Sequence, residues 1–355
     1  MSAAPVIVIA GGGTGGHLFP GLAVAEVLRQ RGASVHFIGT ERGLEARRVP
    51  QEGYPLHLIS VSGLLRVGLL ARLRGITRLP LAALQTLRLL QRLRPAVVVG
   101  VGGYASGPAV LLAALAGFPS AVLEQNSVPG RTNRLLARVA TRLFLAFPEA
   151  ADYFPRGARE RVVLAGNPVR RALLAAFTAA PAVAGPAREP TVLVLGGSQG
   201  AHAVNELVVA ALTHLHQQGA RLPRLLHQSG PADVESLRAR YQALGSPAGT
   251  LTVMPFIEDM GRAYAECDLV IGRAGATTLA ELCAVGRPAL LIPLPTATDD
   301  HQTRNAQHLV QAGAAQHLPQ GATTPAALAQ SLQALLGDPA RLAQMARASH
   351  GLGRP

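Results

Sequence analysis

Residues 11–20 are rich in glycine and include Thr14 and His17, the first residues of the chain that could do chemistry. A β-branched run at 6–9 precedes them, and apolar residues at helical spacing follow up to residue 31. Glycine lets the backbone approach a ligand, and the free N–H groups at a helix start favour an anion. The order strand, turn, helix therefore predicts an anion-binding turn. A tight turn without a ligand is the alternative interpretation.

Polar residues follow other strand candidates in the same way. Residues 102–108 form a further glycine turn, and Glu124 opens a polar group that ends at Asn126. Residues 273–278 carry hydroxyls and helix-start N–H groups that suit a diphosphate. Glu281, one turn later, suits a ribose diol, or is a solvated glutamate stabilised by the helix dipole. Residues 295–305 are either a surface loop or a set of hydrogen-bonding groups for sugar hydroxyls.

The elements that must position these groups form two similar α/β halves. The turn at 11–17 is repeated at 196–202, where Gly197, Gly200 and His202 match Gly12, Gly15 and His17. Short β-branched or apolar runs alternate with helical patterns throughout, which is typical of parallel sheets. Strands are predicted at 6–9, 35–38, 56–61, 97–101, 121–123, 143–147, 161–164, 191–195, 225–228, 251–254, 269–271 and 289–292. Helices of the second half are predicted at 203–217, 233–244, 259–266, 276–285, 303–312 and 325–336, and an exposed helix at 41–52.

Composition narrows the class of protein. The chain of 355 residues is long enough for two domains. Its net charge is +13, and it contains arginine but no lysine. Residues 1–164 hold 19 arginines against 8 acidic residues, so the first half is expected to meet any anionic surface. The two cysteines, Cys267 and Cys283, form no disulfide framework or metal pattern, which favours the cytosol. We expect neither a signal peptide nor a membrane span; glycines and prolines interrupt the uncharged stretch 95–123.

The segment 64–94 interleaves leucines with arginines, and no acidic residue occurs between 53 and 123. One interpretation is one or two core-facing helices with basic outer faces. The second is a surface that docks on an anionic bilayer, because arginines are attracted to it and leucines can enter the interface. A nucleic-acid groove is disfavoured because the segment lacks aromatic stacking platforms.

Seven motifs, in order along the chain, resemble the MurG family of glycosyltransferase family 28. They are Gly-Gly-Gly-Thr-Gly-Gly-His (11–17), Gly-Gly-Tyr-x-Ser-Gly-Pro (102–108), Glu-Gln-Asn (124–126), Gly-Asn-Pro-Val-Arg (166–170), Gly-Gly-Ser-Gln-Gly-Ala (196–201), His-Gln-Ser-Gly (227–230) and Asp-His-Gln (300–302). The family's enzymes move N-acetylglucosamine from UDP-N-acetylglucosamine onto lipid I, which gives lipid II in peptidoglycan synthesis.

The resemblance implies a GT-B fold, that is, two Rossmann-like α/β domains whose parallel sheets face a deep cleft. We expect an acceptor domain at 1–164, a donor domain at 165–355 and a linker near 172–190. UDP-N-acetylglucosamine and lipid I would be the substrates, and no cofactor or metal would be required. The protein would bind the cytoplasmic face of an anionic cell membrane peripherally through 64–94. Other cell-wall synthesis enzymes would be further partners, and nucleic acid would not.

The resemblance also implies site residues by position. The nucleotide would be met by Arg170, Ser198 and the backbone of Ile257, the diphosphate by Ala276, Thr277 and Thr278, and the ribose by Glu281. His301 and Gln302 would meet the sugar hydroxyls. The remaining donor contacts would be Thr14, Gly15, Gly16, Asn126, Leu279 and Ala280. The resemblance also places Gly103, Tyr104 and Ser106 on the acceptor side.

An inverting transfer needs a base for the acceptor hydroxyl and a stabiliser for the departing UDP. We expect His17 to be the base, because histidine titrates near neutral pH, with Glu124 as the alternative. His17 could instead orient the loop or the acceptor diphosphate, and we expect a structural role for His202. Helix N-termini and arginine can stabilise the leaving group without a metal.

Two departures from the family pattern stand out. Leu123 precedes Glu124 where relatives often have histidine. After about residue 345 we expect the last helix, with which GT-B enzymes return to the first domain, to be short or missing. Another UDP-sugar transferase acting on a lipid, a UDP-N-acetylglucosamine epimerase, and a non-catalytic nucleotide-binding membrane protein remain competing functions.

Overall fold

The chain divides into two compact units, Met1–Arg170 and Arg171–Pro355. The computed structural model describes residues 4–41, 43–60, 69–175, 177, 189–197, 200–245 and 249–354, with the backbone alone for 69–79. The division falls after Arg170, whereas the sequence placed the boundary after residue 164. Most of the expected linker, from 178 to 188, lies outside the described residues.

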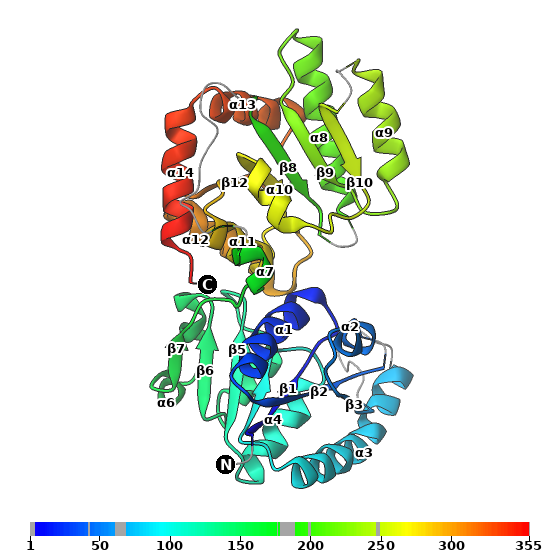
Figure 1. The fold of residues 1–355 in the computed structure, drawn as a ribbon, viewed down its shortest axis with the longest axis vertical. Helices are drawn as coiled ribbons and strands as arrows, with labels where there is room; N and C mark the ends of the chain where they lie inside the picture. The colour runs from blue at the N-terminus through cyan, green and yellow to red at the C-terminus, as the bar shows by residue number, and fades with distance from the viewer. Residues whose placement is uncertain are drawn as a thin grey trace. The chain divides into compact units, whose positions relative to one another are not determined.

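Unit 1 is a seven-stranded parallel sheet in the order β3-β2-β1-β4-β5-β6-β7 (Figure 1). Its strands are β1 Val6–Ala10, β2 Ser34–Gly39, β3 Leu56–Leu58, β4 Val97–Gly100, β5 Ser120–Glu124, β6 Arg142–Leu145 and β7 Val162–Leu164. Its helices are α1 Gly15–Gln30, α2 Glu45–Gln51, α3 Leu69–Leu93, α4 Ser106–Leu115, α5 Arg131–Leu136, the 3-10 turn η1 Pro148–Tyr153 and α6 Arg156–Arg159.

The two faces of this sheet have separate cores because successive strand residues point to opposite sides. Ile7 and Ile9 of β1 pack with Leu18 of α1. Val8 of the same strand packs with Leu90 of α3 in a second cluster that also includes α4 and α5. Helix α1 therefore covers one face, and α3, α4 and α5 cover the other.

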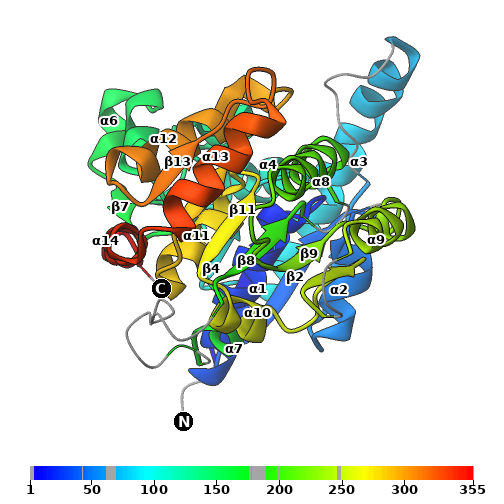
Figure 2. The same ribbon diagram turned by 90° about the horizontal axis from the view of Figure 1, so that it is seen from above.

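Unit 2 also contains a parallel sheet, with six strands in the order β10-β9-β8-β11-β12-β13. Its adjacent strands β9, β8 and β11 are labelled in Figure 2. Its strands are β8 Thr191–Leu195, β9 Arg224–Gln228, β10 Leu251–Met254, β11 Leu269–Gly272, β12 Ala289–Leu291 and β13 Ala315–His317. Its helices are α7 Arg171–Ala175, α8 His202–Gln217, α9 Val234–Ala243, α10 Met260–Glu266, α11 Ala276–Val285, η2 Thr298–Asp300, α12 His301–Gln311, α13 Pro325–Leu336 and α14 Pro339–Gly351.

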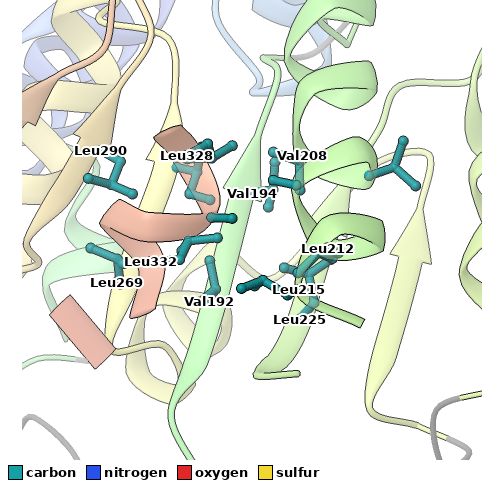
Figure 3. Close-up of a cluster of buried hydrophobic side chains, with 14 of the residues drawn as sticks. Val192, Val194, Val208, Leu212, Leu215, Leu225, Leu269, Leu290, Leu328 and Leu332 are labelled. Atoms are coloured by element: carbon teal, nitrogen blue, oxygen red, sulfur yellow. The ribbon is translucent and has the colours of Figure 1, made fainter. Parts of the chain in front are cut away.

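The core of unit 2 lies between β8 and two helices. Val192 and Val194 of β8 pack with Leu212 of α8 and Leu332 of α13, and all four side chains are buried (Figure 3). Burying an aliphatic side chain of this size stabilises a fold by about 1.5–3 kcal/mol. All five residues of β8 are buried, so the apolar run at 192–195 is explained by a strand that is buried on both faces.

The predicted fold class is confirmed: both units have the Rossmann-like order in which strands 1 and 4 are neighbours. These two strands are β1 and β4 in unit 1 and β8 and β11 in unit 2. They are parallel, and the strands that follow the first are added on one side of the pair, whereas those that follow the second are added on the other side. A ligand crevice lies beyond the carboxyl ends of such a pair. The glycine turns at 11–16, 102–103 and 196–201 and the 273–278 segment all follow one of these four strands.

The last helix, α14, continues past residue 345 to Gly351, begins at an Asp338 cap and packs on α11 and α13 within unit 2. Helix α2 and strand β13 differ from the sequence expectations. Helix α2 is present, but its Glu45 is only 1% exposed, so the prediction of an exposed face was wrong at that residue. The very short strand β13 was not predicted.

No described helix is long and apolar enough to cross a membrane.

Candidate active site

The two glycine turns of unit 1 touch through their backbones. The Gly12 N–H donates to the Gly102 carbonyl at 3.2 Å, and Gly11 N–H donates to Ile38 at 3.0 Å. A β-carbon on Gly11 would overlap the Gly102 carbonyl, and one on Gly103 would overlap the Gly12 carbonyl. All four glycines have positive φ, so both conformation and space require glycine here.

Glu45 stabilises the first glycine turn through hydrogen bonds. Its Oε2 accepts a 2.6 Å hydrogen bond from the Gly13 N–H, and its Oε1 accepts from the N–H and hydroxyl of Thr40 at 3.0 and 2.9 Å. A buried carboxylate is tolerated when donors surround it in this way. Glu45 therefore links the carboxyl end of β2 to the glycine turn. The sequence pattern did not reveal this role.

His17 lies in the first turn of α1 and is half-buried. Its ring lies against Gly102, where a β-carbon would come within 2.6 Å of Nδ1. Nδ1 is 3.2 Å from Oε1 of Gln125, which is buried at the end of β5. Residues that follow β1, β4 and β5 thus determine the position of this imidazole.

Glu124 is 1% exposed and is surrounded by donors. Oε1 accepts from the Asn126 N–H at 2.9 Å, and Oε2 accepts from the Gly130 N–H at 3.1 Å and the Asn133 side chain at 2.8 Å. With both oxygens engaged, Glu124 organises the loop from 125 to 130. The geometry therefore favours His17 over Glu124 as a proton acceptor.

The other predicted residues of unit 1 lie at the same edge of the sheet. Thr14, the cap of α1, and Gly16 are exposed, Gly15 and Asn126 are partly exposed, and Tyr104 is 53% exposed. Ser106 is buried, and its hydroxyl donates to the Gly103 carbonyl at 2.9 Å, which fixes the second turn. Of the acceptor-side residues, Tyr104 is thus available to a ligand and Ser106 shapes the loop.

Arg170 lies in unit 1, not with the predicted donor contacts of unit 2. Its guanidinium is 5.3 Å from the ring centre of Phe19 in α1. A cation over an aromatic face is held electrostatically. The contact therefore places this arginine beside the first helix.

In unit 2, the start of α11 has features of an anion site. Gly275 caps the helix, and Thr277 Oγ1 is buried without a hydrogen-bond partner among the described residues. A buried hydroxyl without a partner is unfavourable, so a ligand oxygen there would be stabilising. The free N–H groups and dipole of the helix start favour an anion. Leu279, also predicted as a donor contact, is only 1% exposed, so its side chain packs in the protein core.

Arg273 and Glu281 flank this helix start. The Arg273 guanidinium donates to the carbonyls of Ile292 and Pro293 at 3.0 and 3.1 Å, and burial lowers its pKa from the usual value. The Tyr264 hydroxyl, which is fully buried, donates to Glu281 Oε2 at 3.1 Å. Glu281 is thus a half-buried, oriented carboxylate rather than a solvated one.

Gln228 joins two loops of unit 2. Its Nε2 donates to the Gly197 carbonyl at 2.8 Å, and its Oε1 accepts from the Ile257 N–H at 3.0 Å. Because Gln228 uses that N–H, the predicted backbone contact of Ile257 with a base would be made through its carbonyl. Ser198 lies outside the described residues.

A buried network lies beside these loops. His227 contacts the Tyr241 hydroxyl through Nδ1 at 2.9 Å and Asn205 Oδ1 through Nε2 at 3.0 Å. Asn205 in turn donates to Asp233, whose carboxylate meets the exposed ring of His202 at 3.0 Å. Burial lowers the pKa of His227 to about 4, which keeps it neutral. His202, the counterpart of His17, is therefore engaged with Asp233.

The loop before α12 is anchored by the predicted sugar-binding residues themselves. His301 Nδ1 is 2.7 Å from the Thr298 carbonyl, and Gln302 Oε1 accepts from the Leu294 N–H at 3.0 Å. Asn305 donates to the Ala274 carbonyl at 3.2 Å, which connects α12 to the start of α11. The structure thus brings 294–305 and 273–278 together within unit 2.

Sequence reasoning missed several residues that position this machinery: Glu45, Gln125, Gln228, Tyr264 and Asn305. Gln125 and Gln228 lie inside motifs that were identified, so their position was a signal. Glu45 and Tyr264 carry no local signal, because only the tertiary fold brings them to their partners.

Two family models match the chain. Residues 7–145 match the glycosyltransferase family 28 N-terminal domain, and residues 191–354 match the glycosyltransferase family 28 C-terminal domain. The first match spans β1 to β6 of unit 1, and the second spans all six strands of unit 2.

Individual proteins are similar over almost the whole length. Proteins of Anaeromyxobacter sp. (strain K) and Myxococcus xanthus (strain DK1622) are each 48% identical over 98% of this chain and 89% of their own. Both are named UDP-N-acetylglucosamine--N-acetylmuramyl-(pentapeptide) pyrophosphoryl-undecaprenol N-acetylglucosamine transferase. The crystal structure of Acinetobacter baumannii MurG has a TM-score of 0.81 and 36% identity, over 99% of this chain and 96% of its own.

Replacing Gly102 tests the contact that places His17. In Gly102→Ala the new methyl group would displace the imidazole, so we expect kcat of the enzyme's reaction to fall about 10-fold or more. Gly117→Ala is the matched control: Gly117 also has positive φ, but no described atom lies within 4 Å of its β-carbon position. Gly117→Ala should lose about 1 kcal/mol of unfolding free energy from its positive φ, and Gly102→Ala should lose more because the His17 ring must also shift. Equal activity of the two variants would contradict the account.

The buried His227 predicts a pH dependence of stability. Its folded pKa is lower than that of an unfolded histidine, so the unfolded chain binds more protons between about pH 6.5 and 4. This contribution is present above pH 6.5 and is lost as pH falls; from pH 7 to 5 it should cost about 2 kcal/mol. Denaturant unfolding of the native chain and His227→Gln measures it. The variant should show the shallower decline, and exposed His216→Gln should match the native chain. Parallel declines in native chain and His227→Gln would refute this assignment.

Proposed function

We propose, from the premise that the chain belongs to glycosyltransferase family 28, that it transfers N-acetylglucosamine from UDP-N-acetylglucosamine to lipid I. The acceptor atom is the C4 hydroxyl oxygen of the N-acetylmuramyl residue, and the product is lipid II of peptidoglycan synthesis. Relatives 43–49% identical over 98% of the chain carry the name of this transferase, which supports the proposal.

The observation that carries the proposal is the placement of His17. Its half-buried imidazole lies at the carboxyl ends of β1, β4 and β5, held by Gly102 and Gln125. A histidine with one ring nitrogen engaged and the other available is suited to accept a proton from an alcohol. His202 at the matching place in unit 2 is instead paired with Asp233.

In this proposal unit 2 binds the donor. The Ile257 carbonyl accepts from the uracil, Glu281 meets the ribose, and the start of α11 with Thr277 meets the diphosphate. The sugar hydroxyls contact His301 or Gln302. The helix start offers N–H groups and the positive end of a dipole, so it stabilises UDP as its negative charge grows.

The chemistry is one displacement. His17 removes the proton from the acceptor hydroxyl, and the oxygen forms a bond to the anomeric carbon. The bond from that carbon to UDP breaks, and its electron pair leaves with UDP. Because the nucleophile enters opposite the leaving group, the α-linked donor gives a β-linked product. The protein groups named above supply base and charge stabilisation, and the proposal requires no metal or cofactor.

Transfer of radiolabelled N-acetylglucosamine from UDP to a short-chain lipid I analogue tests the function. We expect label in the lipid with the native chain and a loss of about 10²–10⁴ in kcat with His17→Ala, which removes the base. His350→Ala, which changes an exposed histidine at the end of α14, is the control and should keep full activity. Absence of label with folded, UDP-binding native protein would overturn the proposal. An epimerised sugar as the product would indicate an epimerase, and labelling of another lipid would indicate a different transferase.

We also propose that unit 1 binds peripherally to the cytoplasmic face of an anionic membrane, where lipid I is anchored. Helix α4 packs between α3 and α5, and this layer exposes large apolar side chains. We call this set the apolar strip; it comprises Leu81, Leu84, Leu111, Leu115, Leu135 and Val139. Arg88 and Arg138 are exposed on the same helical layer. Residues 64–68 of the predicted segment lie outside the described residues.

Vesicle binding tests this surface. Leu84→Glu combined with Leu115→Glu puts two charges into the apolar strip and should weaken binding to phosphatidylglycerol-containing vesicles about 10-fold or more. Binding of the native chain should also fall as salt rises. Val163→Glu, at an exposed position of β7 outside the strip, is the control. If the double variant bound like the native chain, the strip would not be the docking surface.

A further inference from the structure

We infer that Gln125 is a positioning residue that fixes the tautomer of His17, with hydrogen on Nδ1 and the lone pair on Nε2. The inference rests on the proposed function, in which His17 accepts the proton of the acceptor hydroxyl. It adds a named residue that determines which ring nitrogen does so.

The orientation of the Gln125 amide follows from its partners. Its Nε2 lies 2.9 Å from the Val101 carbonyl oxygen at the end of β4. A carbonyl oxygen can only accept a hydrogen bond, so the amide group facing it must be the NH2. The other amide atom, 3.2 Å from His17 Nδ1, is therefore the oxygen.

An amide oxygen also can only accept, so His17 Nδ1 must be the donor. A neutral imidazole carries one hydrogen, and its second nitrogen is then an acceptor. Nε2 therefore keeps its lone pair whenever the ring is neutral. When Nε2 takes a proton, Nδ1–H continues to donate to Gln125, so no rearrangement of the ring is needed.

The surroundings of the ring support a fixed orientation. Gly102 lies against Nδ1 and Cε1, and the Gln125 side chain is 1% exposed and cannot move freely. Neither contact is charged. The nearest carboxylate along the chain, Glu124, is engaged by Asn126, Gly130 and Asn133. The second carboxylate of this region, Glu45, is bonded to Gly13 and Thr40. Gln125 is thus a neutral orienting partner for the base.

A negative charge at position 125 distinguishes a hydrogen-bonding role of Gln125 from a role in packing alone. Gln125→Glu keeps an oxygen facing Nδ1–H but adds a negative charge, which favours the protonated ring. The acid limb of the kcat/KM profile for transfer should therefore move up by about one pH unit or more. Gln125→Met has similar size but offers no such acceptor. It should lower kcat about 10- to 100-fold at every pH, with the KM for UDP-N-acetylglucosamine within about two-fold.

Above the acid limb, Gln125→Glu should be at least about five-fold more active than Gln125→Met, because it preserves the acceptor. Gln51→Glu, at an exposed position in α2, controls for added charge and should leave the profile unchanged. Thermal unfolding of each variant shows whether it is folded. The Nδ1 and Nε2 shifts of ¹⁵N-labelled native chain report the tautomer directly.

The outcomes separate this inference from the proposed function. Loss of transfer in His17→Ala together with an unshifted Gln125→Glu profile would overturn the role of Gln125 and leave the function standing. Hydrogen on Nε2 of neutral His17 would also overturn it. Absence of transfer by the native chain would reject the proposed function instead.

Discussion

The site of unit 1 depends on one backbone contact, in which the turn after β1 meets the turn after β4. Gly11, Gly12, Gly102 and Gly103 have positive φ, and side chains at Gly11 or Gly103 would collide with the opposite carbonyl. The missing side chain at Gly102 also provides the surface on which the His17 ring lies. Glu45 accepts a hydrogen bond from the Gly13 N–H of the first turn, and Gln125 contacts Nδ1 of the His17 ring. The position of the histidine is thus a consequence of how closely two strand ends approach.

The two units share a topology and use it differently. In each, the strands that correspond to 1 and 4 of a Rossmann-like sheet end in glycine-containing segments, where such sheets bind ligands. Unit 1 presents an oriented imidazole there. Unit 2 presents a helix start with a buried threonine hydroxyl, an oriented glutamate and loops connected by Gln228. One unit is chemically suited to accept a proton and the other to bind a nucleoside diphosphate, which is the division of labour that a glycosyl transfer needs.

Much of this arrangement was predictable from sequence, because β-branched runs mark buried strands and glycines mark turns with unusual φ. The strand–turn–helix order at 11–20 and its copy at 196–202 predicted two similar halves. Glu45 was misjudged because a charged pattern in a helix of seven residues does not say which side faces the protein. The burial of the Leu279 side chain likewise follows from its place in α11 and not from its position in a motif. The short strand β13 has little β-branched content, and the partners of Gln125 lie 24 and 108 residues away in sequence.

The configuration of the new glycosidic bond is the most direct measurement of the central claim, a single displacement promoted by a base of unit 1. The native chain would be incubated with UDP-N-acetylglucosamine and a short-chain lipid I analogue, and the anomeric proton of the product would be examined by NMR. The account predicts a β-linked product, since the donor sugar is α-linked and one displacement inverts it. An α-linked product would require a second displacement or attack from the leaving-group side, and would contradict the account.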